Sequence, residues 1–522
     1  MKFKIPLIFI QNAPTFWLGI TLLFWWLGIA GRDLYIVPAI VCLGTSAFQI
    51  RKGNFSNNSI YWLYEYSNKK YFYAIYWVHV GIFLVTTILK YYSFKWNVWD
   101  AGNYSNMLFN ISRGQFYSSY FDVHNWGDHF TPSMTPLAIF YFWIPSIHWL
   151  TLAKTFSYLS VPILIYKICK DSILNKENAW TVTLIIGAFW ILFYSPALNS
   201  LYYEFQPSAL AHPFILYAFL CFQRKKWLFF WITMIILLGF KEHLGSVWIG
   251  FGCFIILNTK FKKTGLLLIG VGVVAIYLIM FHIMPFFRNY EESWSMPIGP
   301  FHDYSGKLIY LLKMLIPLGF LPLIFWRVGV LAGPAIGVNL LSSNPSMYST
   351  SYHYDDISST LLIISLISIF SNWDFKNLKF RGRKKFKECL LISWFLISLS
   401  LIPSSPLREL YKSIPEDQHW LIRDELINFD IFSKDQSIAV QTSLGPHFNR
   451  KEISAITQDS NGKCAPRRRD KLIEDTKFLI FAKSLNHYLI DDLEKCINLI
   501  SFLPEYKKLH GYRHLNIFMN SK

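Results

Sequence analysis

Charged side chains are scarce in this sequence, at 16% of its 522 residues, where a soluble protein has roughly a quarter. Apolar residues make up 53% and aromatic residues 18%. They gather in blocks of about 14 to 20 residues bounded by Lys, Arg, Asn and Pro, close to the length that crosses a bilayer as a helix. The scarcity of charge excludes an ordinary soluble domain and predicts an all-α polytopic membrane protein.

Several motifs are absent as well. The sequence has no Walker loop, no Gly-rich dinucleotide turn and no HExxH or CxxC motif, which argues against nucleotide hydrolysis and redox cofactors. The start is basic at Lys2 and Lys4, but residues 5–15 run directly into further apolar sequence without a clear small-residue cleavage site. We therefore expect an uncleaved first helix rather than a signal peptide.

The apolar blocks predict thirteen membrane spans and three regions. The regions are an N-terminal hairpin (1–50), a multi-helix core (51–403) and a small soluble domain (404–522). The predicted spans are residues 16–30, 34–48, 71–89, 151–168, 179–193, 208–222, 227–240, 244–257, 266–284, 308–325, 328–341, 360–370 and 390–402. Residues 133–150 are apolar too, but they contain Pro136, Pro145 and His148. We interpret them as an interfacial or re-entrant helix.

The basic residues fix the expected orientation. With these spans, the clusters at residues 51–70, 167–176, 224–226, 260–263, 327 and 376–387 all fall on the side of the N-terminus. The positive-inside rule makes that side cytoplasmic, in the cytoplasmic (inner) membrane. The net charge of +18 then reflects these loops and their contact with anionic lipid rather than nucleic-acid binding. Residues 91–132 and the tail are expected outside.

The tail after residue 403 is polar enough for a small α/β domain that acts as a lid or docking module. Residues 437–441 and 477–482 have strand-like patterns, residues 488–503 read as an amphipathic helix, and residues 461–470 read as a loop. Cys464 and Cys496 are expected to pair if the tail lies in an oxidising compartment.

Asp100 lies in the long polar loop at residues 91–132, and two interpretations of it stay open. In one, Asp100 caps a short helix over residues 101–111 that lies on the membrane. In the other, its carboxylate is a general base that deprotonates an acceptor hydroxyl just above the bilayer.

Four more titratable groups follow within eight residues: Asp122, His124, Asp128 and His129. Such a cluster is typical of a divalent metal site or of acid–base chemistry, although hydration alone also produces loops of this kind. Asp122, His124 and Asp128 are the metal candidates. His129, at the return to the membrane, is the catalytic candidate.

The other predicted outer loops carry carboxylates, imidazoles and an ammonium. Glu204 is a second catalytic candidate, and the substrate-binding candidates are Asn103, Lys241, Glu242 and His353. Any one of them could be an ordinary interfacial anchor or ion pair. Since charges between apolar helices are costly unless they are paired or face a cavity, together they predict one polar cleft on the outer side.

The segment WDAGNYSNMLFNISRGQFYSS, with the HF of GDHFTPSMTPLAIFYFW, resembles a family of multi-pass membrane proteins defined by a domain of unknown function. EFQPSALAHP, KEH, SYHYDD and GPHFNRKEISAI match later segments of that family. The resemblance covers roughly residues 94–456. The family in turn resembles the C-type (GT-C) glycosyltransferase superfamily, which includes protein mannosyltransferases and aminoarabinose transferases.

The resemblance implies a GT-C-like core, a polyprenyl-phosphate sugar donor and an acidic residue on the first outer loop, which here is Asp100. The sequence departs from the family at Ser208, where Glu is frequent, and at His243, where Asp is common. Three functions therefore compete: a lipid-linked-sugar glycosyltransferase acting on an envelope acceptor, a lipid or small-molecule transporter or flippase, and a non-catalytic envelope assembly protein.

Overall fold

A computed structural model describes most of the chain. The described residues are 26, 69–172, 179, 182–183, 186–187, 189–190, 193–288, 298–372, 405–433, 436–458, 464–468, 471–473, 475–488 and 490–521. The predicted spans at residues 16–30, 34–48 and 390–402 and the basic run at 376–387 lie outside these ranges, and the span at 179–193 lies mostly outside them.

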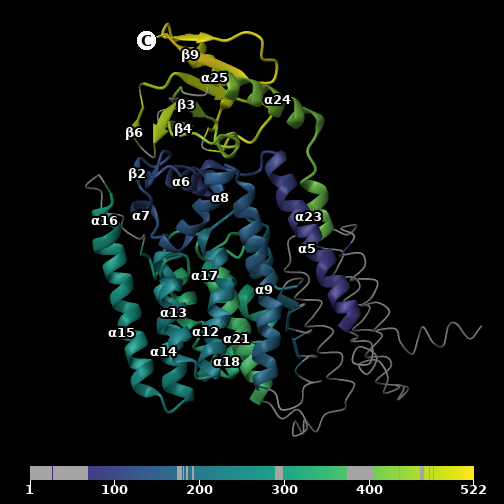
Figure 1. The fold of residues 1–522 in the computed structure, drawn as a ribbon, viewed down its shortest axis with the longest axis vertical. Helices are drawn as coiled ribbons and strands as arrows, with labels where there is room; N and C mark the ends of the chain where they lie inside the picture. Colours follow the sequence, from purple (N-terminus) through teal and green to yellow (C-terminus); the bar gives the residue numbers. More distant parts are fainter. Residues whose placement is uncertain are drawn as a thin grey trace, which may run out of the picture.

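The described core is a bundle of apolar helices (Figure 1). Its main members are α5 (Lys69–Tyr92), α9 (His148–Ser172), α11 (Ser195–Tyr202), α12 (His212–Gln223), α13 (Trp227–Leu238), α14 (Gly245–Asn258), α15 (Lys262–Leu278) and α21 (Asp356–Asn372). By length and composition, two helical stretches in the described ranges are suited to cross a membrane, His148–Ser172 and Lys262–Phe286. The second continues α15 through η6 (Ile279–Ile283) and α16 (Met284–Phe286).

One further candidate span contains a sharp bend between two helical stretches. Helix α11 and the stretch Pro207–Gln223, made of η4 (Pro207–Leu210) and α12, meet at 114° and could together form a third span. Pro207 starts η4, and a proline cannot donate the backbone bond that would continue a helix. Residues 203–206 at this bend are therefore free to point their side chains at the neighbouring loop.

Two predicted spans are wrong as continuous helices. Residues 308–325 divide into α17 (Tyr304–Leu315), η7 (Ile316–Leu318) and α18 (Leu321–Ile324), while residues 328–341 contain the end of α19 (Trp326–Gly329) and α20 (Gly333–Leu341). Pro317 and Pro322 remove backbone donors, and Gly319 and Phe320 between them adopt left-handed φ angles of 59° and 55°. The apolar composition of these two segments predicted their length but not the interruptions of their helices.

Residues 133–150 do not form one span, as expected. They divide into η3 (Pro132–Leu137), α8 (Ala138–Trp143) and the first residues of α9, with a non-helical break around Pro145. Helix α8 contacts the helix after Asp100, and its Phe142 and Trp143 side chains are exposed. An exposed aromatic face of this kind suits the membrane–water interface.

The loop that carries Asp100 is folded rather than extended. It contains η2 (Val98–Gly102), α6 (Asn103–Ile111), a two-stranded antiparallel hairpin of β1 (Tyr117–Ser118) and β2 (Val123–His124), and α7 (Asn125–Asp128). Nearly all of α6 is buried, including its polar residues Asn103, Asn106 and Asn110. The predicted helix over residues 101–111 is thus confirmed in outline, but it lies inside the protein.

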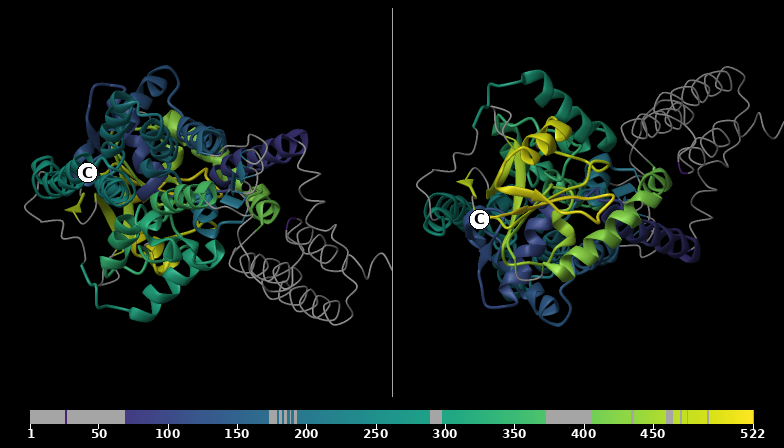
Figure 2. Two further views of the ribbon diagram at one scale, coloured as in Figure 1. Left: turned by 90° about the horizontal axis from the view of Figure 1, so that it is seen from below. Right: turned by 90° about the horizontal axis from the view of Figure 1, so that it is seen from above.

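The C-terminal region forms the predicted α/β domain, and from above it covers one end of the bundle (Figure 2). Its seven-stranded sheet has the order β6-β5-β4-β3-β7-β9-β8, with β3 parallel to β4 and β7 and the other pairs antiparallel. The elements are α23 (Pro406–Lys412), α24 (Asp417–Phe432), β3 (Ile438–Val440), η8 (Gly445–His447), β4 (Ile453–Gln458), β5 (Cys464–Arg468), β6 (Lys471–Leu472), β7 (Phe478–Phe481), α25 (Leu493–Ser501), β8 (Tyr506–Lys508) and β9 (Asn516–Asn520).

Two expectations for the tail need correction. The predicted loop at 461–470 contains strand β5, and the predicted helix at 488–503 is shortened to α25. Cys464 of β5 and Cys496 of α25 form a disulfide. The arginines of residues 467–469 suggested a solvated loop, but Arg467 pairs with Ala455 of β4, so β5 belongs to the sheet.

The sheet separates two apolar clusters. On one face, Ile422 and Phe429 of α24 pack with Val440 and with Phe94 and Val98 of the Asp100 loop. On the other face, α25 packs against a separate cluster that includes Leu479 and Phe518. The domain thus uses one face to cover the loop that carries Asp100.

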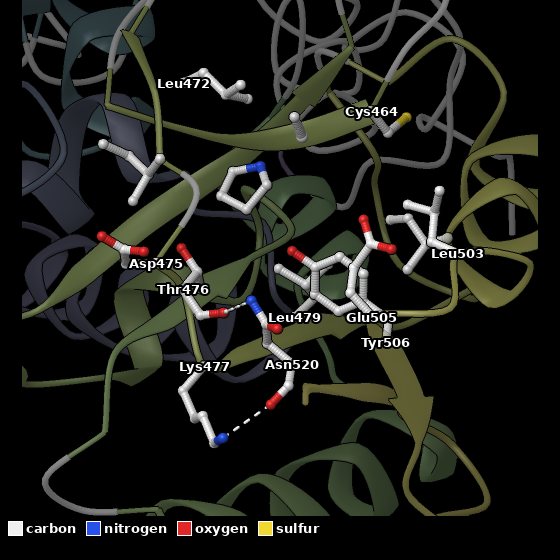
Figure 3. A pocket seen from close by; sticks show the side chains of 14 residues that line it. Cys464, Leu472, Asp475, Thr476, Lys477, Leu479, Leu503, Glu505, Tyr506 and Asn520 are labelled. Carbon is white, nitrogen blue, oxygen red and sulfur yellow. Dashed lines mark hydrogen bonds between the residues drawn. The ribbon is translucent and has the colours of Figure 1, made fainter. Parts of the chain in front are cut away.

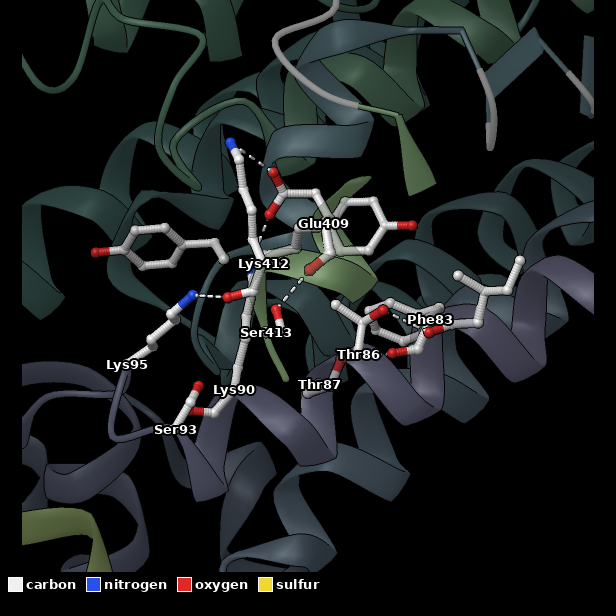
Figure 4. A network of polar contacts seen from close by, with 12 residues as sticks. Phe83, Thr86, Thr87, Lys90, Ser93, Lys95, Glu409, Lys412 and Ser413 are labelled. Atoms are coloured by element: carbon white, nitrogen blue, oxygen red, sulfur yellow. Dashed lines mark hydrogen bonds and ion pairs between the residues drawn. The ribbon is translucent and has the colours of Figure 1, made fainter. Parts of the chain in front are cut away.

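Helix α23 is fastened to α5 by ionic and backbone contacts (Figure 4). The Nζ of Lys90 lies 3.3 Å from Oε2 of Glu409 and also donates to the carbonyl of Tyr202 at 2.7 Å. Lys95 donates to the carbonyl of Lys412. The route from the bundle into the C-terminal domain is therefore fixed beside the bend that follows α11.

Candidate active site

Asp100 lies inside a π-helical turn, Val98–Gly102, and not at the end of α6. Gly102 is the residue before α6, and no side chain caps that helix. The interpretation of Asp100 as a helix cap is therefore wrong. π-Turns are uncommon and are often found at functional sites.

The Asp100 carboxylate is held by the bend after α11. The hydroxyl of Tyr203 donates to Oδ2 at 2.7 Å, and the Nε2 of Gln206 donates to Oδ1. Burial raises the pKa of the Asp100 carboxyl, while the Tyr203 hydrogen bond and the charge of Lys241 oppose that rise. A carboxylate whose pKa is raised by its surroundings is better matched to proton abstraction near neutral pH.

Glu204 is directed at the backbone of the same turn. Its carboxylate accepts from the backbone N of Asn97 at 2.9 Å, from Nδ2 of Asn97 at 2.8 Å and from the backbone N of Ala101 at 3.5 Å. Burial and the nearby charge of Asp100 raise the pKa of Glu204 to about 8, and these donors oppose the rise. Glu204 thus holds the turn while Tyr203 and Gln206 hold the Asp100 carboxylate.

The bend itself rests on a buried lysine. The Nζ of Lys154, on α9, donates to the carbonyls of Ser200 at 2.9 Å, Tyr203 at 2.9 Å and Glu204 at 3.2 Å. Carbonyls at the end of a helix lack partners within the helix, and an ammonium both satisfies them and suits the helix dipole. Lys154 therefore fixes the backbone from which Tyr203 and Glu204 project.

Lys241 lies next to Asp100 but contacts it through Gln206. Its Nζ donates to Oε1 of Gln206 at 3.2 Å, and its side chain is 4% exposed. Within the described part of the chain, no carboxylate forms an ion pair with Lys241. A buried ammonium that no carboxylate contacts directly is costly, so this position suits an anionic ligand.

His129 and Glu242 contact each other beside Lys241. The Nδ1 of His129 lies 2.9 Å from Oε1 of Glu242, and its Nε2 lies 4.0 Å from a carboxylate oxygen of Asp128. Burial alone would raise the pKa of Glu242, but His129 and Lys241 together hold it below its ordinary range. The pair joins the end of the Asp100 loop to the helix junction at residues 241–244.

His353 belongs to the same group of buried side chains as Tyr203 and Lys241. It is buried, its ring centroid lies 4.9 Å from that of Tyr203 and 4.2 Å from that of Tyr354, and neither ring nitrogen has a partner among the described residues. Burial and the charge of Lys241 lower the pKa of His353, which favours the neutral imidazole. The ring can therefore both donate and accept a hydrogen bond.

The remaining candidate residues predicted from the sequence make contacts within the loop that carries Asp100. The Oδ1 of Asn103 accepts from Ser118 at 2.6 Å, and Asp122 accepts from Tyr117. His124 accepts from the backbone N of Trp126 at 3.2 Å. Within the described ranges, no three His, Cys, Asp or Glu side chains form a group suited to a metal ion. The proposed metal candidates Asp122, His124 and Asp128 thus make separate contacts, and no reaction step is assigned to a metal.

Sequence reasoning missed Tyr203 and Gln206. Tyr203 directly precedes Glu204, and Gln206 follows it two positions later in the segment EFQPSALAHP, which matches a family segment. A tyrosine and a glutamine carry no charge, so a search for charged residues in the outer loops gave no reason to select them. Their proximity in sequence to Glu204, at a predicted outer loop, was the available signal.

A separate cavity of about 390 Å³ lies in the C-terminal domain (Figure 3). Its lining includes Leu479 and Ile500, which belong to the cluster under α25, together with Asp475 and Glu505. The Asp100 loop packs on the opposite face of the sheet. This cavity is therefore distinct from the candidate active site.

Solved structures share the fold. ArnT from Cupriavidus metallidurans bound to undecaprenyl phosphate superposes with a TM-score of 0.53 and 9% identity, covering 86% of this chain and 97% of that one. ArnT from the same organism in the apo state gives 0.50 and 11%, covering 85% and 98%. At such identity the likeness establishes the fold alone. No curated protein matches the sequence.

The likeness in fold to ArnT agrees with the resemblance of the sequence to the GT-C superfamily. The model of the family described as "Predicted membrane protein (DUF2079)" matches residues 90–488, and the chain belongs to this family.

Proposed function

We propose that this protein is a membrane glycosyltransferase that moves a sugar from a polyprenyl-phosphate carrier to an acceptor hydroxyl at the outer face of the cytoplasmic membrane. The observation that carries the proposal is the pairing of a held carboxylate, Asp100, with a buried ammonium, Lys241, that forms no direct ion pair in the described structure. Such a pair supplies the two things this transfer needs, a base and a phosphate site.

In the proposed reaction, Lys241 binds the phosphate of the donor while the polyprenyl chain remains in the membrane. Asp100 takes the proton of the acceptor hydroxyl as its oxygen forms a bond to the anomeric carbon of the sugar. The bond between that carbon and the phosphate oxygen breaks, and the polyprenyl phosphate leaves with the bonding electrons. The ring of His353 lies against Tyr203 and Tyr354, and its nitrogens have no hydrogen-bond partner among the described residues. It offers a neutral donor for the phosphate or the sugar.

The proposed topology keeps the cytoplasmic N-terminus, with the described α14–α15 turn inside. That turn lies at the end of the bundle away from the C-terminal sheet (Figure 1), and it carries Lys260, Lys262 and Lys263. The sheet and the Asp100 loop would then share the outer side. ArnT bound to undecaprenyl phosphate has the same fold, which supports a polyprenyl-phosphate partner here.

The test is a transfer assay in membranes with radiolabelled polyprenyl-phosphate sugars. We expect Asp100→Asn to lower turnover by about 10²–10⁴-fold, since it keeps the shape but removes the base. Lys241→Met should instead raise the KM for the donor. Asp424→Asn, the same acid-to-amide change on an exposed part of α24, is the matched control.

Full transfer by Asp100→Asn would remove Asp100 from the mechanism. Should wild-type membranes transfer no sugar from any labelled donor, the transferase proposal fails, and a transporter or an assembly protein becomes the better explanation. The two are separated by measuring movement of polyprenyl-phosphate lipids between leaflets of vesicles that contain the protein.

A further inference from the structure

The connection between β3 and β4 lies directly against the turn that carries Asp100. We call residues 442–451 the docking segment. The backbone N of Val98 donates to the carbonyl of Thr442 at 3.1 Å. This bond joins the C-terminal domain to the Asp100 turn at a position two residues before Asp100.

The other end of the docking segment is bonded to the elements that follow the turn. The Nδ2 of Asn106 donates to the carbonyl of Arg450 at 2.7 Å, and the hydroxyl of Ser119 donates to the carbonyl of Lys451. The Oδ1 of Asn106 in turn accepts from the backbone N of Ser119 at 3.0 Å. Helix α6 and the hairpin after it are therefore fixed to the same segment as Val98.

Packing in the middle of the docking segment leaves no space for a side chain at residue 445. A Cβ added to Gly445 would lie 2.2 Å from Cγ1 of Val98 and 2.6 Å from the hydroxyl of Tyr120. The φ of Gly445 is not left-handed, so the cost of a methyl group is contact with these two atoms. His447, in the same segment, has its ring centroid 4.2 Å from that of Tyr91 and 4.1 Å from that of Phe94.

The docking segment is itself held from behind. The buried guanidinium of Arg450 donates from Nε at 2.8 Å and Nη2 at 2.6 Å to Oδ1 of Asp430, from Nη2 at 2.8 Å to the hydroxyl of Ser433 and from Nη1 at 3.1 Å to the carbonyl of Gln436. A guanidinium bonded in several directions fixes the backbone that carries it. The segment thus presents a firm surface to the Asp100 turn.

We propose that the C-terminal domain is a positioning element of the active site, and that the docking segment sets the orientation of Asp100. Glu204 holds the Asp100 turn from the bundle, and the docking segment holds it from the domain. The proposal rests on the proposed function in taking Asp100 as the reacting group. A reacting group displaced by about 1 Å loses about 10²-fold in rate, so loosening this contact lowers turnover without touching the substrate.

The experiment, in the full-length protein, enlarges the residue on one side of the contact and then shortens the residues on the other side. Gly445→Ala is expected to lower kcat by about 10–100-fold and to leave the donor KM unchanged, because the phosphate site at Lys241 contacts other elements. Adding Val98→Ala and Tyr120→Phe removes both atoms that the new methyl group would meet. The combined variant is expected to recover activity relative to Gly445→Ala.

Two controls define the baseline. The Val98→Ala/Tyr120→Phe variant keeps Gly445. It measures how much activity is lost when the two contacting groups are removed and no methyl group fills the space. Ser501→Ala, on the exposed end of α25, is a small change elsewhere in the same domain and is expected to leave kcat unchanged. Recovery in the combined variant beyond what the two sets of changes give separately demonstrates the coupling.

Hydrogen–deuterium exchange gives a readout that needs no activity. Gly445→Ala is expected to speed exchange of the backbone amides of residues 97–111, and the combined variant to slow it again. Unchanged kcat and exchange in Gly445→Ala would overturn the proposal. A loss of kcat that adding Val98→Ala and Tyr120→Phe does not reverse would also overturn it.

The two proposals fail differently. If Asp100→Asn keeps full transfer, the proposed role of Asp100 is rejected. Hydrogen–deuterium exchange of the amides of residues 97–111 still measures the contact with the docking segment in that case. If Asp100→Asn loses transfer and Gly445→Ala keeps it with unchanged exchange, the transferase proposal stands and the positioning role of the domain is rejected.

Discussion

Lys241 and Asp100 are bonded to opposite ends of one side-chain amide, that of Gln206. An ammonium can only donate and an ionised carboxylate can only accept. The Gln206 carbonyl must therefore face Lys241, and its amino group must face Asp100. The orientation of this amide is fixed by chemistry, and it aligns the base with the proposed phosphate site.

Gln206→Glu is expected to lower kcat at least tenfold, roughly the loss that follows misalignment of a catalytic group. The new carboxylate cannot donate to Asp100 and places a second negative charge beside it, which raises the pKa of the Asp100 carboxyl. Because the base works only when ionised, the acidic limb of the pH–kcat profile should move to higher pH. An unshifted profile would show that Gln206 does not act on Asp100.

Stability should depend on pH through Glu204. Its pKa is raised to about 8 by burial and by Asp100, so the folded state binds this proton more tightly than the unfolded state does. The corresponding stabilisation is fully present below the unfolded pKa of about 4.5 and is lost as the pH rises toward 8. The thermal unfolding temperature of wild type relative to Glu204→Gln, measured in detergent, is therefore expected to fall between pH 5 and pH 8.

Because both proteins share every other titrating group, the difference between the two curves reports Glu204 together with its charge interaction with Asp100. A difference that stays constant across this range would mean that Glu204 is ionised throughout, with its N–H donors outweighing burial.

Lys154→Met is expected to destabilise the protein by about 2–4 kcal/mol, because it leaves buried carbonyls at the end of α11 without donors. Lys170→Met, an exposed position on the same helix, is the control and should change stability by about 0.5 kcal/mol or less. Denaturation in detergent measures both. Equal effects from the two variants would show that Lys154 does not support the bend.

Orientation can be tested with reporters at two turns. Gly114 has a left-handed φ of 78° and open space around it, so a fusion there should be tolerated and should report the outer side. A fusion after Lys260, in the turn between α14 and α15, should report the cytoplasm. A cytoplasmic signal from the Gly114 fusion would overturn both the topology and the location of the site.

The sequence predicted much of the site because charge is rare in it. Asp100, Lys241 and His353 stood out against apolar surroundings, and the structure gathers them around Tyr203 and Gln206. Gln206 and the docking segment were beyond sequence reasoning for different reasons. An uncharged amide gives no electrostatic signal, and Asn106 and Arg450 are separated by 344 positions, a distance over which local patterns carry no information.

Single helices of the core were predicted better than the places where they are interrupted. Apolar composition located α9 and α14 well, but residues 308–325 contain Pro317 and Pro322, which the hydropathy pattern does not register. The strand at Cys464–Arg468 was missed for a related reason. Its arginines suggested solvent, although backbone pairing with β4 decides the structure.

The contact between Val98 and Thr442 has a consequence for the order of events during synthesis. The helices of the bundle emerge from the ribosome first, and domains generally fold as units as they appear. The Asp100 turn lacks its covering segment until residue 451 has been made. The proposed active site is therefore complete only after the docking segment has been made, so a chain that stops short of the final domain carries the acidic turn in an unfinished form.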